Sequence, residues 1–204
     1  MQMKPLFLKR PVIFIWLILI GNNAFTQPGR YSVANAHAHN DYEHNIPFVQ
    51  AFDLGFGSVE ADVILEKDTL FVGHNHDDIY NKPLYFERDY IEPLNAAIRI
   101  NRDAGRQVVL LIDLKTEAIA TLNKVMEIIE KYPALTRSAA VRFVITGNQP
   151  PASDFEKYPD YIYFDGDINN PGHLQHLSRI GMFSDNFRKY SQWKGEGRIP
   201  KSEE

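Results

Sequence analysis

The chain has 204 residues, 44% of them hydrophobic and 12% aromatic, which is enough apolar material for one domain with a substantial core. Its 22 basic and 26 acidic side chains give a formal net charge of −4, and no basic block stands out beyond the N-terminus, so the composition argues against a nucleic-acid partner. There is no cysteine, which excludes both disulfides and a lipid-modified cysteine.

The N-terminal segment has the pattern of a targeting sequence. Three basic residues precede an apolar run at residues 12–20 that is too short to span a bilayer comfortably, and residues 24–26 form an acceptable small-residue cleavage site. We expect a signal peptide over residues 1–26, a mature chain that starts near Gln27, and no stable membrane span after cleavage. An uncleaved anchor is the alternative. Export without cysteine indicates a periplasmic or secreted protein, and a bacterial periplasm more than a disulfide-stapled extracellular module.

After this segment, short β-branched runs alternate with stretches of helical periodicity. Residues 108–115 (VVLLIDLK) are the clearest buried strand, because nearly all are branched and apolar until the last three. Residues 116–131 are the clearest helix, with an apolar stripe and Pro133 just beyond its end. The other expected elements are strand 33–39, helix 46–56, strands 58–65 and 68–73, helix 89–104, strands 141–147 and 161–165, helix 171–180 and strand 182–186.

This alternation predicts right-handed β/α units around a parallel sheet. No glycine-rich phosphate loop follows the first strand, which weakens the case for a dinucleotide-binding fold. Instead, nearly every strand ends in a polar residue, as in the active sites of β/α barrels: His39, Asp62, His74, Asp113, Asp165 and Asp185. For the last two, helix capping is the alternative role.

The number of strands falls short of a complete barrel, which has eight strands and about 250 residues. The pattern predicts six core strands, and residues 188–204 are too polar to hold two more. We therefore expect an α/β fold of the TIM (β/α)8 type that is truncated after about six strands. It would form one domain over residues 27–204, incomplete at its C-terminus.

Strand alternation groups the polar side chains. Residues two apart on a strand share a face, so Glu60 lies with Asp62, and Asp113 with Lys115. Three carboxylates from two neighbouring strands suit a hard divalent cation, which prefers oxygen ligands and offsets their mutual repulsion. Histidines end the flanking strands, and their ordinary acidity suits proton transfer near neutral pH. Together these groups predict metal-assisted attack on a phosphoryl centre.

The motifs in these strands resemble the superfamily of glycerophosphodiester phosphodiesterases and phosphatidylinositol-specific phospholipases C. The matching segments are Ala38-His39, Asn45, Glu60-Ala61-Asp62, Val72-Gly73-His74 and Asp113-Leu114-Lys115. The strings HNDY at residues 39–42 and SVEADV at residues 58–63 are more similar to the branch named after the altered inheritance of mitochondria protein 6. The resemblance extends over residues 33–200.

The resemblance implies an exported, metal-dependent phosphoric diester hydrolase. Its substrate would be of the glycerophosphodiester or phosphoinositide type, either a small phosphodiester or a lipid head group. The implied site consists of Glu60, Asp62 and Asp113 as ligands of Ca²⁺ or Mg²⁺, His39 and His74 as acid and base, and Lys115 against phosphate charge. Asn40 departs from the family pattern, because it replaces an arginine beside the first histidine and so removes a phosphate contact.

Several alternatives stay open. His76 competes with His74 as the second catalytic histidine, because the two are two residues apart on the same side of the chain. His37 is either an additional ligand or a satisfied polar residue. The segment His37-Ala38-His39 also suits a metal-dependent hydrolase of the His-x-His barrel type. The short C-terminus suits a non-catalytic barrel remnant that binds metal or phosphate.

Overall fold

The computed structural model describes residues 31–100 and 105–202. The expected signal peptide at residues 1–26 lies outside the described residues, as do the last four residues of the helix expected at 89–104. Within the described ranges, no helix combines the length and the apolar character that crossing a membrane requires.

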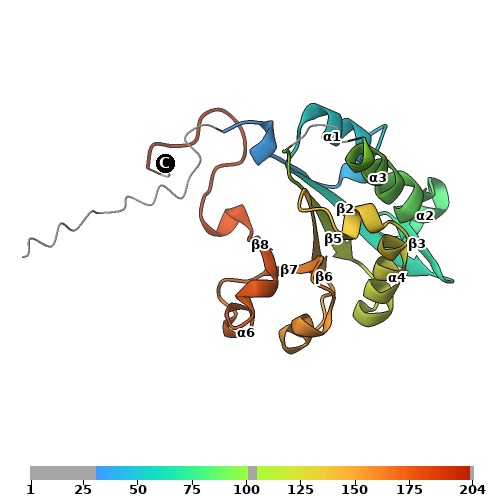
Figure 1. Ribbon diagram of the computed structural model, residues 1–204. Coiled ribbons are helices and arrows are strands. Elements are labelled where there is room, and N and C mark those ends of the chain that lie inside the picture. Colours follow the sequence, from blue (N-terminus) through green and yellow to red (C-terminus); the bar gives the residue numbers. More distant parts are fainter. Residues whose placement is uncertain (1–30, 101–104, 203–204) are drawn as a thin grey trace, which may run out of the picture. The chain divides into compact units, whose positions relative to one another are not determined.

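A mixed sheet of eight strands runs through the described chain (Figure 1). Six strands are parallel and lie in chain order: β1 His37–Ala38, β2 Ser58–Glu66, β5 Val108–Leu114, β6 Val141–Gly147, β7 Ile162–Gly166 and β8 Ile180–Phe183. One edge of β2 pairs with β5, and the other pairs with β1 at its start and with antiparallel β3 (Thr69–Val72) at its end. Strand β4 (Leu84–Tyr85) pairs with β3. In the described ranges β1 does not pair with β8, so the sheet is not closed, and the barrel stays a prediction.

Helices α1 (Val49–Leu54), α3 (Glu92–Arg99) and α4 (Ala118–Glu130) lie on one side of β2 and β5 (Figure 1). The apolar core lies between these helices and the sheet, and its β2 members are Val59, Ala61 and Val63. Because side chains alternate along a strand, Glu60 and Asp62 point to the opposite face. The β2 strand thus separates the apolar core from the polar group.

The long, strongly patterned elements are confirmed. The strands expected at 58–65, 108–115 and 141–147 and the helix expected at 116–131 coincide with β2, β5, β6 and α4 to within two residues. The short elements that were not predicted include α2 (His76–Asn81), β4 and α5 (Pro133–Thr136).

The predictions of the first strand, the last strand and the helix at 171–180 were partly wrong. Residues Val33–Asn35 form a 3-10 turn, because Asn35 Oδ1 accepts a hydrogen bond from the Ser32 amide at 3.0 Å, and such local bonds compete with strand pairing. Strand β8 ends at Phe183 instead of residue 186, because the Ser184 amide donates to a carboxylate of β7. Helix 171–180 divides into α6 (Pro171–Leu174) and a 3-10 turn at Leu177–Arg179.

Candidate functional site

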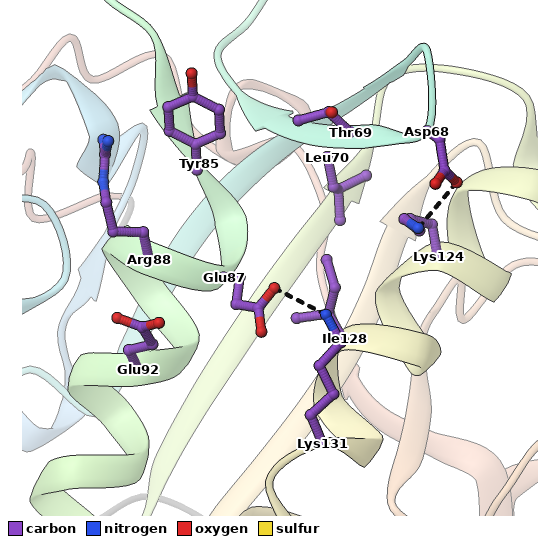
Figure 2. A pocket seen from close by; sticks show the side chains of 10 residues that line it. All are labelled: Asp68, Thr69, Leu70, Tyr85, Glu87, Arg88, Glu92, Lys124, Ile128 and Lys131. Carbon is purple, nitrogen blue, oxygen red and sulfur yellow. Dashed lines mark hydrogen bonds and ion pairs between the residues drawn. The ribbon is translucent and has the colours of Figure 1, made fainter.

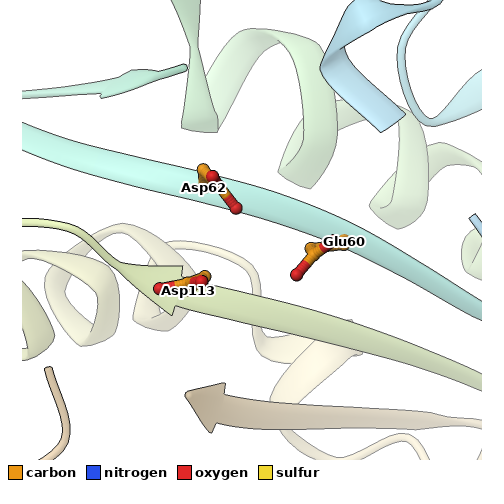
Figure 3. Close-up of side chains that lie close together, drawn as sticks. All are labelled: Glu60, Asp62 and Asp113. Atoms are coloured by element: carbon orange, nitrogen blue, oxygen red, sulfur yellow. The ribbon is translucent and has the colours of Figure 1, made fainter. Parts of the chain in front are cut away.

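Three carboxylates meet on the face of the sheet that is opposite the apolar core. Glu60 and Asp62 lie on β2, and the parallel register places Asp113 of β5 beside Asp62. One oxygen of each side chain lies within 4.8 Å of the other two, and Figure 3 shows the side chains converging between the two strands. Glu60 is 7% exposed and Asp62 is 1% exposed. The structure therefore brings together the three carboxylates that strand alternation groups.

A glycine makes room for Asp113. Gly147, the last residue of β6, has φ +72°, a left-handed conformation that favours glycine. A Cβ at this position would overlap Asp113 Oδ1 and would lie only 2.8 Å from the carbonyl oxygen of Leu114. The end of β6 thus leaves space for the carboxylate on the neighbouring strand.

The two oxygens of Asp62 have different surroundings. Oδ2 accepts hydrogen bonds from Tyr42 Oη at 3.0 Å, from His74 Nδ1 at 3.0 Å and from Lys115 Nζ at 2.9 Å. Oδ1 is buried and has no hydrogen-bond partner in the described part of the chain. A buried carboxylate oxygen without a partner is costly, and a bound cation would remove that cost. Asp62 therefore suits the role of a metal-binding carboxylate: the protein holds Oδ2, and Oδ1 is available to a cation.

Lys115 lies between two of the carboxylates. Its Nζ is 2.7 Å from Asp113 Oδ2 and 2.9 Å from Asp62 Oδ2. Burial lowers the pKa of Lys115, but the hydrogen bonds to Asp113 and Asp62 raise it more, so the ammonium stays charged. Burial raises the pKa of Asp113, and the negative charges of Asp62 and Glu60 raise it further, whereas Lys115 opposes them. A single ammonium leaves the group of three carboxylates with an excess of negative charge.

Glu60 is flanked by the two histidines of the first strand end. Its Oε2 accepts a hydrogen bond from the Asn40 amide at 2.9 Å and lies 3.6 Å from His37 Nε2 and 3.7 Å from His39 Nε2. The other ring nitrogen of His37 is 2.9 Å from Ser58 Oγ. Burial raises the pKa of Glu60, but these hydrogen bonds and the histidine charges lower it below its ordinary value. Glu60 is thus held as a carboxylate.

The structure separates the two histidines that compete for the second position. His74 Nδ1 contacts Asp62 at 3.0 Å, whereas His76 Nδ1 is 3.3 Å from Glu66 near the far end of β2. Because a carboxylate can only accept, His74 Nδ1 carries the proton in this contact, and Nε2 is left for a substrate. The side chain of His74 is 63% exposed, and that of His39 is 73% exposed. His39 and His74 therefore flank the carboxylates and are open to solvent, whereas His76, which is also exposed, lies beside Glu66 instead.

The other aspartates at strand ends, Asp165 and Asp185, make hydrogen bonds that stabilise the loops around them. Asp165 is buried at the end of β7 and accepts hydrogen bonds from the amide and hydroxyl of Ser184 and from Thr146 Oγ1 at 3.2 Å. Asp185 is bound by Lys189 and Tyr190, and these hydrogen bonds lower its pKa to about 2. Neither joins the three carboxylates, and the helix expected after β7 is capped by Asn170 instead.

Sequence reasoning missed Tyr42 and Asp41. Both lie in the 3-10 turn Asp41–Glu43, which follows Asn40 in a left-handed conformation (φ 49°). Asp41 is fully buried and accepts hydrogen bonds from the Phe48 amide and from Tyr90 Oη at 3.1 Å. The HNDY string marks this turn, but no periodicity indicates that its side chains point inward. Asn45, which the motif comparison singled out, is exposed.

Two of the hollows in the described part of the chain are lined by residues of both β3 and β4. One, of about 300 Å³, adjoins the candidate site, because Tyr42 and Gly73 line it. The other, of about 340 Å³, lies between strands β3 and β4 and helix α4 (Figure 2). In the latter, Lys124 pairs with Asp68 at 2.9 Å and Lys131 with Glu87 at 3.0 Å. Only the first hollow is positioned to hold part of a substrate of the carboxylate site.

Residues 30–103 match the family described as AIM6-like phosphodiesterase domain. The chain is 41% identical over 70 residues to Altered inheritance of mitochondria protein 6 of Eremothecium gossypii. It is 44% identical over 64 residues to Altered inheritance of mitochondria protein 6 homolog of Arthroderma benhamiae. These alignments cover 33% and 28% of this chain, and 18% and 20% of the two relatives, so only about a fifth of each relative is matched. No solved structure gives a significant match.

The comparisons confirm the resemblance to this branch for residues 30–103. That segment contains Glu60, Asp62 and both exposed histidines of the site. Asp113 and Lys115 lie beyond it, and their place beside Asp62 comes from the fold alone.

Proposed function

Residues 30–103 are similar to an AIM6-like phosphodiesterase domain, and from this premise we propose that the chain hydrolyses phosphodiesters with the help of a divalent cation. The substrate class is a glycerophosphodiester- or phosphoinositide-type diester, free or as a lipid head group. The chain would act outside the cytoplasm, as the pattern of residues 1–26 predicts.

The arrangement of the three carboxylates is the observation that supports a divalent cation in the proposed site. Glu60, Asp62 and Asp113 offer oxygen atoms within 4.8 Å of one another, and Oδ1 of Asp62 is buried without a partner in the described residues. Oxygen ligands of this kind suit Ca²⁺ or Mg²⁺, and a softer metal would favour nitrogen or sulfur. When bound, such a cation would polarise a phosphoryl oxygen and offset the charge that develops in the transition state.

The side chains around the carboxylates would then move protons and hold phosphate. The side chain of His74 is 63% exposed while Asp62 holds its Nδ1–H, so the ring is oriented for proton transfer through Nε2. His39, beside Glu60, supplies a second exposed imidazole. One imidazole takes the proton of the attacking hydroxyl or water, and the other gives a proton to the leaving oxygen. The ammonium of Lys115 adds positive charge next to the phosphate.

The effect of a cation on unfolding tests this proposal. We expect millimolar Ca²⁺ or Mg²⁺ to raise the unfolding midpoint of the wild-type chain, because a ligand that binds only the folded state stabilises it. Glu60→Gln should abolish the rise and reduce hydrolysis of a chromogenic phosphodiester. Glu66→Gln is the matched control, since Glu66 lies on the same strand but pairs with His76 and Tyr80. An unchanged midpoint in the wild type, or equal rises in all three proteins, would contradict the cation site.

One observation favours a second function, a metal-dependent hydrolase of the His-x-His type. His37 and His39 both approach Glu60 Oε2, at 3.6 and 3.7 Å. That chemistry needs further histidines at later strand ends, where β6, β7 and β8 end at Gly147, Gly166 and Phe183. A rise in unfolding midpoint with Zn²⁺ but not with Mg²⁺ or Ca²⁺ would favour this function over the first.

A further inference from the structure

We propose that Tyr42 is a positioning residue, whose hydroxyl holds Asp62 so that Oδ1 faces the cation. The inference rests on the proposed function, since it concerns the same site. It adds a residue that lies outside the set of carboxylates, histidines and lysine. It also explains why Oδ2 of Asp62 accepts three hydrogen bonds while Oδ1 has no partner among the described residues.

The hydrogen bonds of Asp62 come from three separate segments. Tyr42 belongs to the turn after β1, His74 follows β3, and Lys115 follows β5. All three donate to Oδ2, at 2.9 to 3.0 Å. Three donors on a single oxygen fix the rotation of the carboxylate and use the accepting capacity of Oδ2. The remaining oxygen, Oδ1, is buried without a partner in the described residues, within the group formed with Glu60 and Asp113.

Tyr42 differs from the other two donors in its burial. It is 7% exposed, whereas the side chains of His74 and Lys115 are 63% and 22% exposed. A phenol is protonated near pH 7, because its ordinary pKa is about 10, so the hydroxyl remains a donor. His74 must change its protonation during a reaction, and Lys115 must also contact phosphate. Tyr42 is therefore the donor that holds Asp62 while the other two are engaged.

The backbone around Tyr42 is itself anchored. Asp41, the preceding residue, is fully buried and bound to the Phe48 amide and to Tyr90 Oη. Tyr90 lies in the π-helix Glu87–Ile91, so the turn is tied to a second element. This anchoring keeps the phenol of Tyr42 in place without help from a substrate.

The experiment titrates the full chain with Mg²⁺ and with Ca²⁺, and it measures the unfolding midpoint at each cation concentration. Tyr42→Phe keeps the ring and removes the hydroxyl. We expect the cation concentration that gives a fixed rise in midpoint to increase roughly tenfold, equivalent to about 1.4 kcal/mol, with the same rise still reached at the higher concentration. The matched control is Tyr132→Phe, because Tyr132 donates a comparable hydrogen bond to Glu87 at 2.9 Å, away from the site. A purely structural role predicts that both variants need the same cation concentration for the same rise in midpoint.

The outcomes separate this inference from the proposed function. If the wild type responds to a cation and Tyr42→Phe responds at the same concentration, the positioning role is wrong and the cation site stands. If the wild type does not respond, the proposed function fails and the inference fails with it. Should Tyr42→Phe fail to fold, 3-fluorotyrosine at position 42 is the second variant, since it has the same shape and is a stronger donor. Tighter cation binding would then support the inference, and unchanged binding would overturn it.

Discussion

Asp41 is a fully buried carboxyl whose titration should be visible in stability. Burial raises its pKa above the ordinary 3.8, although the hydrogen bonds from Phe48 and Tyr90 oppose the rise. Above pH 3.8 the folded state therefore holds this proton more tightly than the unfolded state, so its contribution to stability falls as pH rises through the raised pKa. Asp41→Asn lacks this titration. In urea unfolding from pH 3.5 to 7.5, we expect the stability of the wild type relative to Asp41→Asn to fall with increasing pH. A constant or growing difference would contradict the raised pKa.

Gly147 is the residue whose substitution should damage the site most directly. Gly147→Ala forces a left-handed conformation on a non-glycine residue and pushes a methyl group against Asp113. We expect a loss of about 1–3 kcal/mol of unfolding free energy, together with loss of the cation-dependent rise in midpoint. The control is Gly55→Ala, which has φ +92° but whose Cβ would meet only Val33, at 4.0 Å. A cation response in Gly147→Ala equal to that of the control would show that Asp113 is not a ligand.

The sequence predicted the side-chain groupings of the site only where the local geometry of a strand determines them. The pairs Glu60 with Asp62, and Asp113 with Lys115, follow from the two-residue repeat of a strand. His74 and His76 could not be separated by that rule, because the strand ends before them. Asn75 caps α2, which begins at His76, so the chain turns between the two histidines. Contacts between distant segments, such as the one from Tyr42 to Asp62, leave no periodic signal at all.

At the scale of elements, α4 should contribute stability without shaping the site. Leu122 is 0% exposed within this helix, and Ile119 on the same helix is 41% exposed. Leu122→Ala should lower the unfolding free energy by about 2–5 kcal/mol, because it leaves a cavity in the core, while Ile119→Ala should change it by about 0.5 kcal/mol or less. Neither variant should change the cation concentration that gives a fixed rise in midpoint, since the helix packs against the face of β2 opposite Glu60 and Asp62. A shift in Leu122→Ala alone would show that the core and the site are coupled.

The predictability of an element depended on its length. Strand β5 and helix α4 were found because seven and thirteen residues carry a full apolar pattern. Strand β4 has two residues and α5 has four, too few for any repeat to show. Residues 33–39 look like a strand by composition, but the hydrogen bond that Asn35 Oδ1 accepts from the Ser32 amide bends the first half into a turn. Tertiary pairing, and not local preference, sets the two residues of β1 that remain.

For the whole molecule, the sequence indicated parallel β/α order but not how the sheet begins and ends. The six parallel strands lie in the predicted order, since each crossover carries its chain to the next position. Closure into a barrel depends on pairing between strands far apart in the sequence, which no local pattern specifies. The antiparallel strands β3 and β4 are a second example, because only the fold shows that β3 pairs with the edge of β2 that β1 also uses.

The two ends of the sheet should differ in stability, which hydrogen exchange can measure. Strand β5 is paired along both edges and five of its seven residues are buried, so its amides should exchange only when the whole chain unfolds. In the described ranges β8 pairs only with β7, and none of its residues is buried, so its amides should exchange through local opening. A cation held between β2 and β5 would stabilise the folded state against global unfolding. Saturating Mg²⁺ should therefore slow exchange in β5 and leave β8 unchanged, because β8 can open without disturbing Glu60, Asp62 or Asp113. Equal slowing in both strands would mean that the sheet opens as one unit and that the site senses both ends.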